Sequence, residues 1–145
     1  MREAALADYL RDPLDGAQPA AITRALARLH KGELLSPAAT QHLLGLLADV
    51  RTGPQRLKGG LPPGWTIGHK TGTGQDYRGT SVGINDVGLL TAPDGRTYAV
   101  AVMMRRTHKP VPQRLELMQA VTRTVAAHWA GDGPQLVTAS RNAAD

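Results

Sequence analysis

Three segments of the chain repeat apolar residues at the three- and four-residue spacing of an amphipathic α-helix. The first, residues 19–31, opens with a proline suited to the first helical turn and ends before Gly32. The second, residues 36–50, starts at a serine that can cap the helix, and its leucine stripe is wide enough for a buried helix. The third, residues 112–129, is long enough to lie across one face of a sheet.

The residues between the second and third helices change to the alternation that is typical of β-strands. Three segments have this pattern, namely residues 65–70, 82–91 and 97–104. Asp94-Gly95 supplies the positive φ of a tight hairpin between the last two, so the strands should be sequential and antiparallel. The pattern predicts an α+β fold over residues 1–131, an antiparallel sheet with flanking helices, and then a disordered tail over residues 132–145.

Composition and charge exclude several classes of function. The net charge is +5, but the basic residues are scattered and no aromatic platform accompanies them, so we expect no nucleic-acid partner. The chain has no cysteine, and no histidine has metal-ligand spacing with another ligand residue, so neither a metal nor a cofactor is expected. No run approaches the ~18 apolar residues of a membrane span, and the charged N-terminus does not resemble a signal peptide.

Three ordered motifs indicate a family. Residues 68–74 read G-H-K-T-G-T-G and residues 52–62 read T-G-P-Q-R-L-K-G-G-L-P, while residues 85–88 read N-D-V-G and precede a P-D-G turn. Together they resemble the extended-spectrum branch of class A serine β-lactamases, in which K-T-G is one of the family's motifs. The resemblance covers roughly residues 8 to 130. It implies the β-lactamase/transpeptidase-like fold, a five-stranded antiparallel sheet beside a helical domain.

The upstream motifs of that family are absent from this chain. Class A enzymes carry their nucleophile in S-x-x-K and a second serine in S-D-N, both before K-T-G. The only serines here are Ser36, Ser81 and Ser140, and none of them begins S-x-x-K. The chain therefore resembles the C-terminal half of the fold, starting near the loop of the deacylating glutamate.

The resemblance implies roles for the K-T-G residues and for one arginine. Lys70 would hold positive potential near the substrate carboxylate, and Thr71 would offer that carboxylate a hydroxyl. Gly72 lets substrate lie against the strand, and the backbone N–H of Thr73 corresponds to one donor of the oxyanion hole. Arg56 resembles the guanidinium that binds the carboxylate in this branch, with ordinary surface charge as the alternative. His69 should point to the opposite sheet face and serve in packing.

Glu3 is the candidate for the deacylating glutamate. Glu3-Ala4-Ala5-Leu6 matches the first and fourth positions of the family's E-x-x-L-N element. An ungapped count back from Pro19 puts Arg2 at that place, so the match needs one deletion. The alternative is a terminal carboxylate without a catalytic role.

The function implied by the resemblance is hydrolysis of the β-lactam ring through an acyl-enzyme, which confers antibiotic resistance. The substrate would be a small β-lactam, and the full-length family works in the periplasm or outside the cell. Because the nucleophile is missing, we expect this chain to be inactive alone. The alternatives are a non-catalytic protein that binds β-lactam or peptidoglycan-like ligands, and a fragment of a penicillin-binding transpeptidase.

The same resemblance predicts an exposed sheet edge. In the family, the strand that corresponds to residues 97–104 pairs with a strand of the missing half. An apolar strand with unpaired backbone groups is a site of association. We therefore expect the chain to associate with itself or with an N-terminal fragment.

Overall fold

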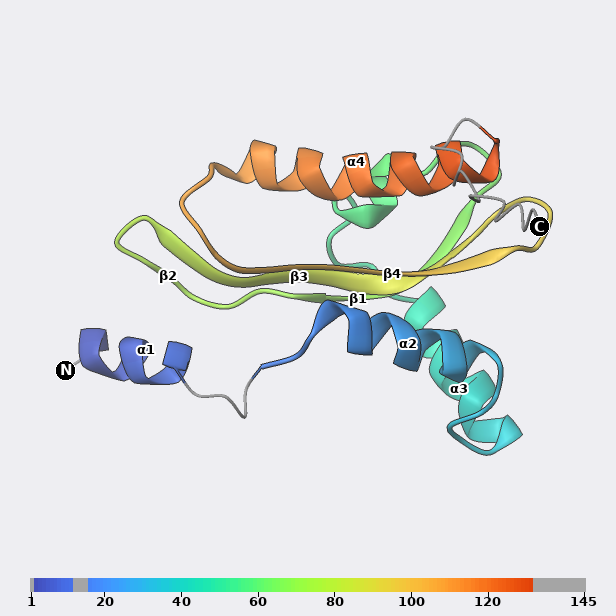
Figure 1. Ribbon diagram of the computed structural model, residues 1–145, viewed down its shortest axis with the longest axis horizontal. Coiled ribbons are helices and arrows are strands. Elements are labelled where there is room, and N and C mark those ends of the chain that lie inside the picture. The colour runs from blue at the N-terminus through green and yellow to red at the C-terminus, as the bar shows by residue number, and fades with distance from the viewer. Residues whose placement is uncertain (1, 12–15, 132–145) are drawn as a thin grey trace, which may run out of the picture.

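An antiparallel sheet lies at the centre of the computed structural model, which describes residues 2–11 and 16–131 (Figure 1). Its strands are β1 (Thr66–Gly72), β2 (Asp76–Tyr77), β3 (Thr80–Thr91) and β4 (Thr97–Thr107). β1 and β4 pair with opposite sides of β3, and the two-residue β2 continues the line of β1 along β3. The predicted α+β fold with three sequential antiparallel strands is confirmed, whereas β2 is too short to show an alternating pattern.

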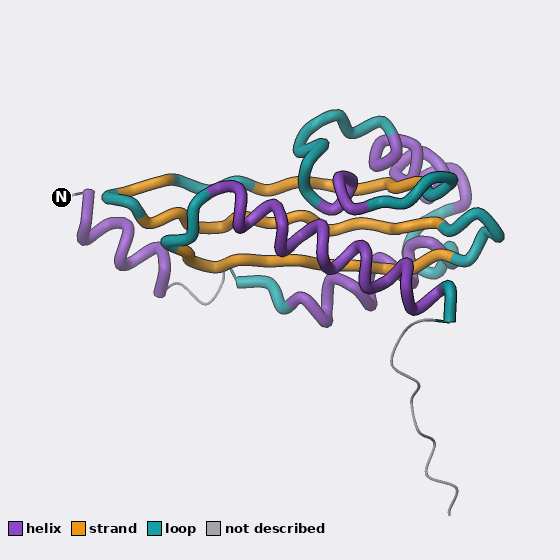
Figure 2. The backbone as a smooth tube through the Cα atoms, turned by 90° about the horizontal axis from the view of Figure 1, so that it is seen from above, coloured by secondary structure: helices purple, strands orange, loops and turns teal. Residues whose placement is uncertain are grey.

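Helices cover both faces of this sheet (Figures 1 and 2). The long helix α4 (Val111–Trp129) lies on one face, and α2 (Pro19–His30) and α3 (Pro37–Ala48) lie on the other. A further helix, α1 (Arg2–Arg11), lies at the end of the molecule that carries β2. Within residues 2–11 and 16–131, no helix combines the length and the apolar character that a bilayer span requires.

The main core fills the layer between the sheet and α4. Leu57, Leu90 and Met118 are fully buried there, and Trp65 stacks on Tyr98 with their ring centroids 5.9 Å apart. Leu57 belongs to the short 3₁₀ helix η1 (Leu57–Gly60), which packs against α4. This core holds β1 and the segment before it in one rigid layer, and that layer carries the K-T-G residues.

The predicted helix starts agree with the structure. Pro19 occupies the first turn of α2, and the hydroxyl of Ser36 accepts a hydrogen bond from the Ala39 N–H (3.3 Å) at the start of α3. α1 was not predicted, because its sequence has no clear apolar periodicity. The predicted tail, residues 132–145, lies outside the described residues.

The prediction of a buried second helix was wrong. Thr40 is the buried residue of α3, and Leu46 is 53% exposed. The reason is that α3 packs against β1 and α2 with one side only, so its other leucines are half-buried and none is fully buried.

Candidate functional site

The K-T-G residues occupy the end of β1, where the strand leaves its main pairing with β3. Lys70 and Gly72 pair with Val87 and Asn85 in the register of the sheet. The Lys70 side chain is exposed, and its Nζ donates to the carbonyl of the neighbouring Thr71 (2.6 Å). Among the described residues, no carboxylate forms an ion pair with Lys70. Its charge is therefore available to an anion at this edge.

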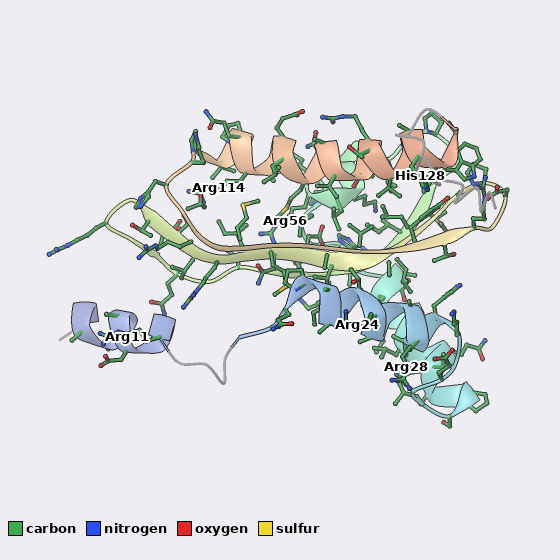
Figure 3. All side chains as sticks on the ribbon, viewed as in Figure 1. Arg11, Arg24, Arg28, Arg56, Arg114 and His128 are labelled. Carbon is green, nitrogen blue, oxygen red and sulfur yellow. The ribbon has the colours of Figure 1, made fainter. Side chains whose placement is uncertain are left out.

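The guanidinium of Arg56 reaches the same strand end from the preceding loop (Figure 3). Its Nη1 donates to the carbonyl oxygens of Gly72 (2.9 Å) and Asn85 (2.7 Å), and its Nη2 donates to the hydroxyl of Thr73 (2.5 Å). These bonds use three of the five N–H donors of the group. Arg56 thus fastens the end of β1 to β3 and keeps donors for a further acceptor.

Thr71 and the glycine of the loop complete this edge. The hydroxyls of Thr52 and Thr71 lie 2.7 Å apart. Gly53, between this contact and Arg56, has φ of 62°, and a Cβ there would lie 2.7 Å from Thr71 Cγ2 and 2.9 Å from Arg56 Cδ. Only glycine fits this conformation and this space, so the T-G of the 52–62 motif serves the close approach of loop and strand.

A buried polar pair lies beneath Lys70 on the α4 face of the sheet. His69 is 1% exposed and Asp86 is fully buried, and His69 Nδ1 lies 2.8 Å from Asp86 Oδ1. The second carboxylate oxygen of Asp86 accepts from the backbone N–H of Leu57 (3.1 Å). His69 is thus buried and turned away from Lys70 as predicted. Asp86 was not predicted as its polar partner, although an aspartate inside the apolar strand β3 indicates a buried polar contact.

The structure brings five of the six predicted site residues together, namely Arg56, Lys70, Thr71, Gly72 and Thr73. The sixth, Glu3, belongs to α1, and its side chain lies outside the described residues. Within the described part of the chain, no group of three His, Cys, Asp or Glu side chains is placed to hold a metal ion. The site is therefore a cationic strand edge with threonine hydroxyls, which suits an anionic ligand.

The two serines in the described part of the chain have structural positions. Ser36 caps α3, as described above, and Ser81 is buried in β3, 3% exposed. Ser140 lies outside the described residues. Neither Ser36 nor Ser81 belongs to the group of side chains around Lys70 and Arg56.

Comparison with known proteins assigns the chain to one family. The model of the "Beta-lactamase enzyme family" matches residues 3–129. The extended-spectrum β-lactamase PER-1 of Pseudomonas aeruginosa is 38% identical over 80 residues, which are 55% of this chain and 26% of that protein. A β-lactamase of Bacteroides uniformis is 31% identical over 109 residues, 74% of this chain and 37% of that protein.

A solved structure gives the same result. The crystal structure of the TLA-3 extended-spectrum β-lactamase superposes with a TM-score of 0.74 at 30% identity, covering 78% of this chain and 42% of that one. The chain therefore spans less than half the length of these relatives.

Proposed function

Because the chain belongs to the class A β-lactamase family, we propose that its strand edge is the carboxylate-binding half of a site that hydrolyses β-lactams. The observation that carries the proposal is the convergence of Lys70, Arg56 and the Thr73 hydroxyl on the exposed end of β1. An arginine with two further N–H donors, beside a lysine that forms no ion pair with any described carboxylate, suits the carboxylate of such a substrate.

The chemistry divides between this chain and the part of the relatives that it does not cover. A serine hydroxyl from that part would attack the β-lactam carbonyl, the ring C–N bond would break, and water would then hydrolyse the resulting ester. The Thr73 N–H would stabilise the carbonyl oxygen while it carries negative charge. Lys70 and Arg56 would hold the substrate carboxylate, so that the carbonyl faces the serine.

We propose that the chain alone does not turn over substrate, because its sequence has no S-x-x-K or S-D-N motif. The structural positions of Ser36 and Ser81 support this expectation. The alternative function is a protein that binds β-lactam or peptidoglycan-like acyl compounds without hydrolysis. It would use the same strand edge, but no serine from a second polypeptide would complete the site.

A reconstitution assay tests the proposal. The 145-residue chain is assayed with a chromogenic cephalosporin, alone and after mixing with the part of the TLA-3 enzyme that it does not cover. We expect hydrolysis only after mixing. In the active mixture, Lys70→Ala should lower kcat/KM by about 100-fold or more, as expected when a charged group that binds and orients the substrate is removed.

The matched control is Lys58→Ala, which removes an exposed lysine of η1 two residues from Arg56. It should leave turnover unchanged. A mixture that forms a complex and stays silent would support the non-catalytic alternative. Hydrolysis by the chain alone would contradict the proposal and would point to one of its own serines.

A further inference from the structure

Asp86 is a fully buried carboxylate with two different partners. Its Oδ1 lies 2.8 Å from His69 Nδ1, and its Oδ2 accepts a hydrogen bond from the Leu57 N–H at 3.1 Å. His69 directly precedes Lys70 in β1, and Leu57 directly follows Arg56. One buried side chain therefore contacts the chain neighbours of both cations of the strand edge.

Both backbone polar groups of Leu57 are hydrogen-bonded to other parts of the chain. Its N–H donates to Asp86, and its carbonyl oxygen accepts from the hydroxyl of Thr122 in α4 (2.8 Å). The Leu57 side chain and Thr122 are both fully buried. Leaving a buried N–H or carboxylate without a partner costs more than an ordinary hydrogen bond gains, so Leu57 cannot shift without a large penalty.

The segment around Leu57 is also pressed against α4. A Cβ on Gly60 would lie 2.4 Å from the carbonyl oxygen of Gln119, and the Gln119 side-chain amide donates to the carbonyl of Gln55 (2.7 Å). The backbone on each side of Arg56 is therefore fixed to α4. Asp86 adds the bond that fixes it to the sheet, at the residue next to Arg56.

We propose that Asp86 is a positioning residue for Arg56: through the Leu57 N–H it sets the distance of the guanidinium from the end of β1, and so its readiness to bind a substrate carboxylate. The three hydrogen bonds of Arg56 tolerate little displacement, because their strength falls steeply with distance and angle. The identity of the bound carboxylate rests on the proposed function, whereas the effect of Asp86 on the position of the Arg56 guanidinium is independent of it.

The test uses the reactivity of arginine itself, on the 145-residue chain without ligand. Dicarbonyl reagents such as p-hydroxyphenylglyoxal add to the two η nitrogens, and in Arg56 both of these are hydrogen-bonded to the chain. The rate of modification is read by mass spectrometry of the Arg56 peptide, relative to the exposed Arg28 of α2. In Asp86→Ala we expect the relative rate at Arg56 to rise about tenfold or more, as local protection is lost.

Asp94→Ala is the matched control. Like Asp86, Asp94 is a carboxylate with two hydrogen-bond partners, in this case Trp129 and Arg96, but it lies in the turn between β3 and β4. Asp94→Ala should leave the relative rate at Arg56 unchanged. Equal reactivity of Arg56 in the wild type and in Asp86→Ala, or an equal rise in both variants, would overturn the positioning role.

A second variant covers the case in which Asp86→Ala does not fold. Thr122→Val removes the hydroxyl that donates to the Leu57 carbonyl, so we expect a smaller rise in the modification rate of Arg56. Thr122→Ser keeps the hydroxyl and should react at the wild-type rate. The control Thr124→Val removes a hydroxyl that bonds within α4, to Ala120. If Thr122→Val and Thr124→Val react alike, Leu57 does not control Arg56. A failure of the reconstituted enzyme to hydrolyse β-lactams would remove the proposed function without changing these rates.

Discussion

Arg56 combines a structural task with the proposed binding task. Three of its donors hold Gly72, Thr73 and Asn85, so the guanidinium is part of the wall of the site. A guanidinium whose rotamers are already fixed loses little entropy when it binds a carboxylate. The same bonds make Arg56 sensitive to substitution by another cation, because an ammonium group cannot reproduce the planar fork.

This geometry predicts the effect of Arg56→Lys in the reconstituted enzyme. We expect KM to rise and kcat/KM to fall by about 10- to 100-fold, the range that corresponds to losing one hydrogen bond to a charged group. The measurement is the dependence of cephalosporin hydrolysis on substrate concentration. Arg51→Lys, in an exposed residue of the same loop, is the control and should behave as the wild type. Unchanged KM in Arg56→Lys would limit Arg56 to its structural task.

Motifs identified the residues of the strand edge, but not what holds them. Lys70 and Arg56 were recognisable because each stands in a short local pattern. The bond between Asp86 and Leu57 joins residues 29 positions apart, and the contact between Asp86 and His69 depends on the register between β1 and β3. A single sequence carries no direct signal for that register. The burial of His69 followed from alternation within one strand, and its pairing with Asp86 did not.

Between elements, the hairpin that joins β3 to β4 is fastened to the end of α4. Asp94 Oδ2 accepts from the indole N–H of Trp129 (2.8 Å) and from the guanidinium of Arg96 (2.7 Å). Asp94 Oδ1 accepts from the backbone N–H of Arg96 (3.0 Å). The bond from Trp129, together with those from Arg96, lowers the pKa of Asp94 to about 2. The ionised carboxylate thus ties the turn to the helix that covers it.

The lowered pKa makes this tie dependent on pH. The unfolded chain binds the proton at about pH 4 and the folded chain only at about pH 2, so the contribution of Asp94 to stability is complete above pH 4 and is lost as the pH falls towards 2. Asp94→Asn should therefore lower Tm at pH 6, and its difference from the wild type should shrink below about pH 4. Circular dichroism melts from pH 6 to pH 2 measure this. Trp129→Phe should reproduce part of the effect, and a difference that stays constant with pH would contradict it.

Local patterns predicted most of the elements, whereas their burial depended on what packs against them. α2 and α4 begin and end within a few residues of the predicted ranges because their start signals and apolar spacing are strong. β4 continues past residue 104 because the pairing of Ser81 with Thr107 extends the ladder into a polar end. The leucine stripe of α3 specified a helix correctly, but no other described element covers its outer side.

Two surfaces of the whole molecule are left open. β4 pairs with β3 along one side, and no other described strand pairs with its second side. On the opposite face from α4, an open groove is lined by the end of α2, the turn after it and α3, with residues such as His30, Pro37, Leu44 and Ala48, and Leu46 of α3 is exposed. The chain spans less than half the length of its relatives.

These surfaces predict that the 145-residue chain associates with itself, and that β4 is the main contact. Along residues 97–104, no described strand pairs with the second side of β4, so this edge is open to a second strand, whereas scattered exposed leucines give weaker and less directional contacts. Sedimentation velocity over a range of concentrations should show association. Leu46→Glu should change its dissociation constant by less than about tenfold, which is 1.4 kcal/mol.

Hydrogen exchange locates the contact directly. The N–H groups on the open side of β4 should become protected as concentration rises, and the complementary part of the TLA-3 enzyme should compete for the same protection. If Leu46→Glu abolishes association, the α3 surface is the contact and the edge is not. A single monomeric boundary at every concentration, together with cooperative thermal unfolding, would mean that β4 is protected without a partner. Its twist and the helix α2, which packs against it, would then be sufficient to block pairing.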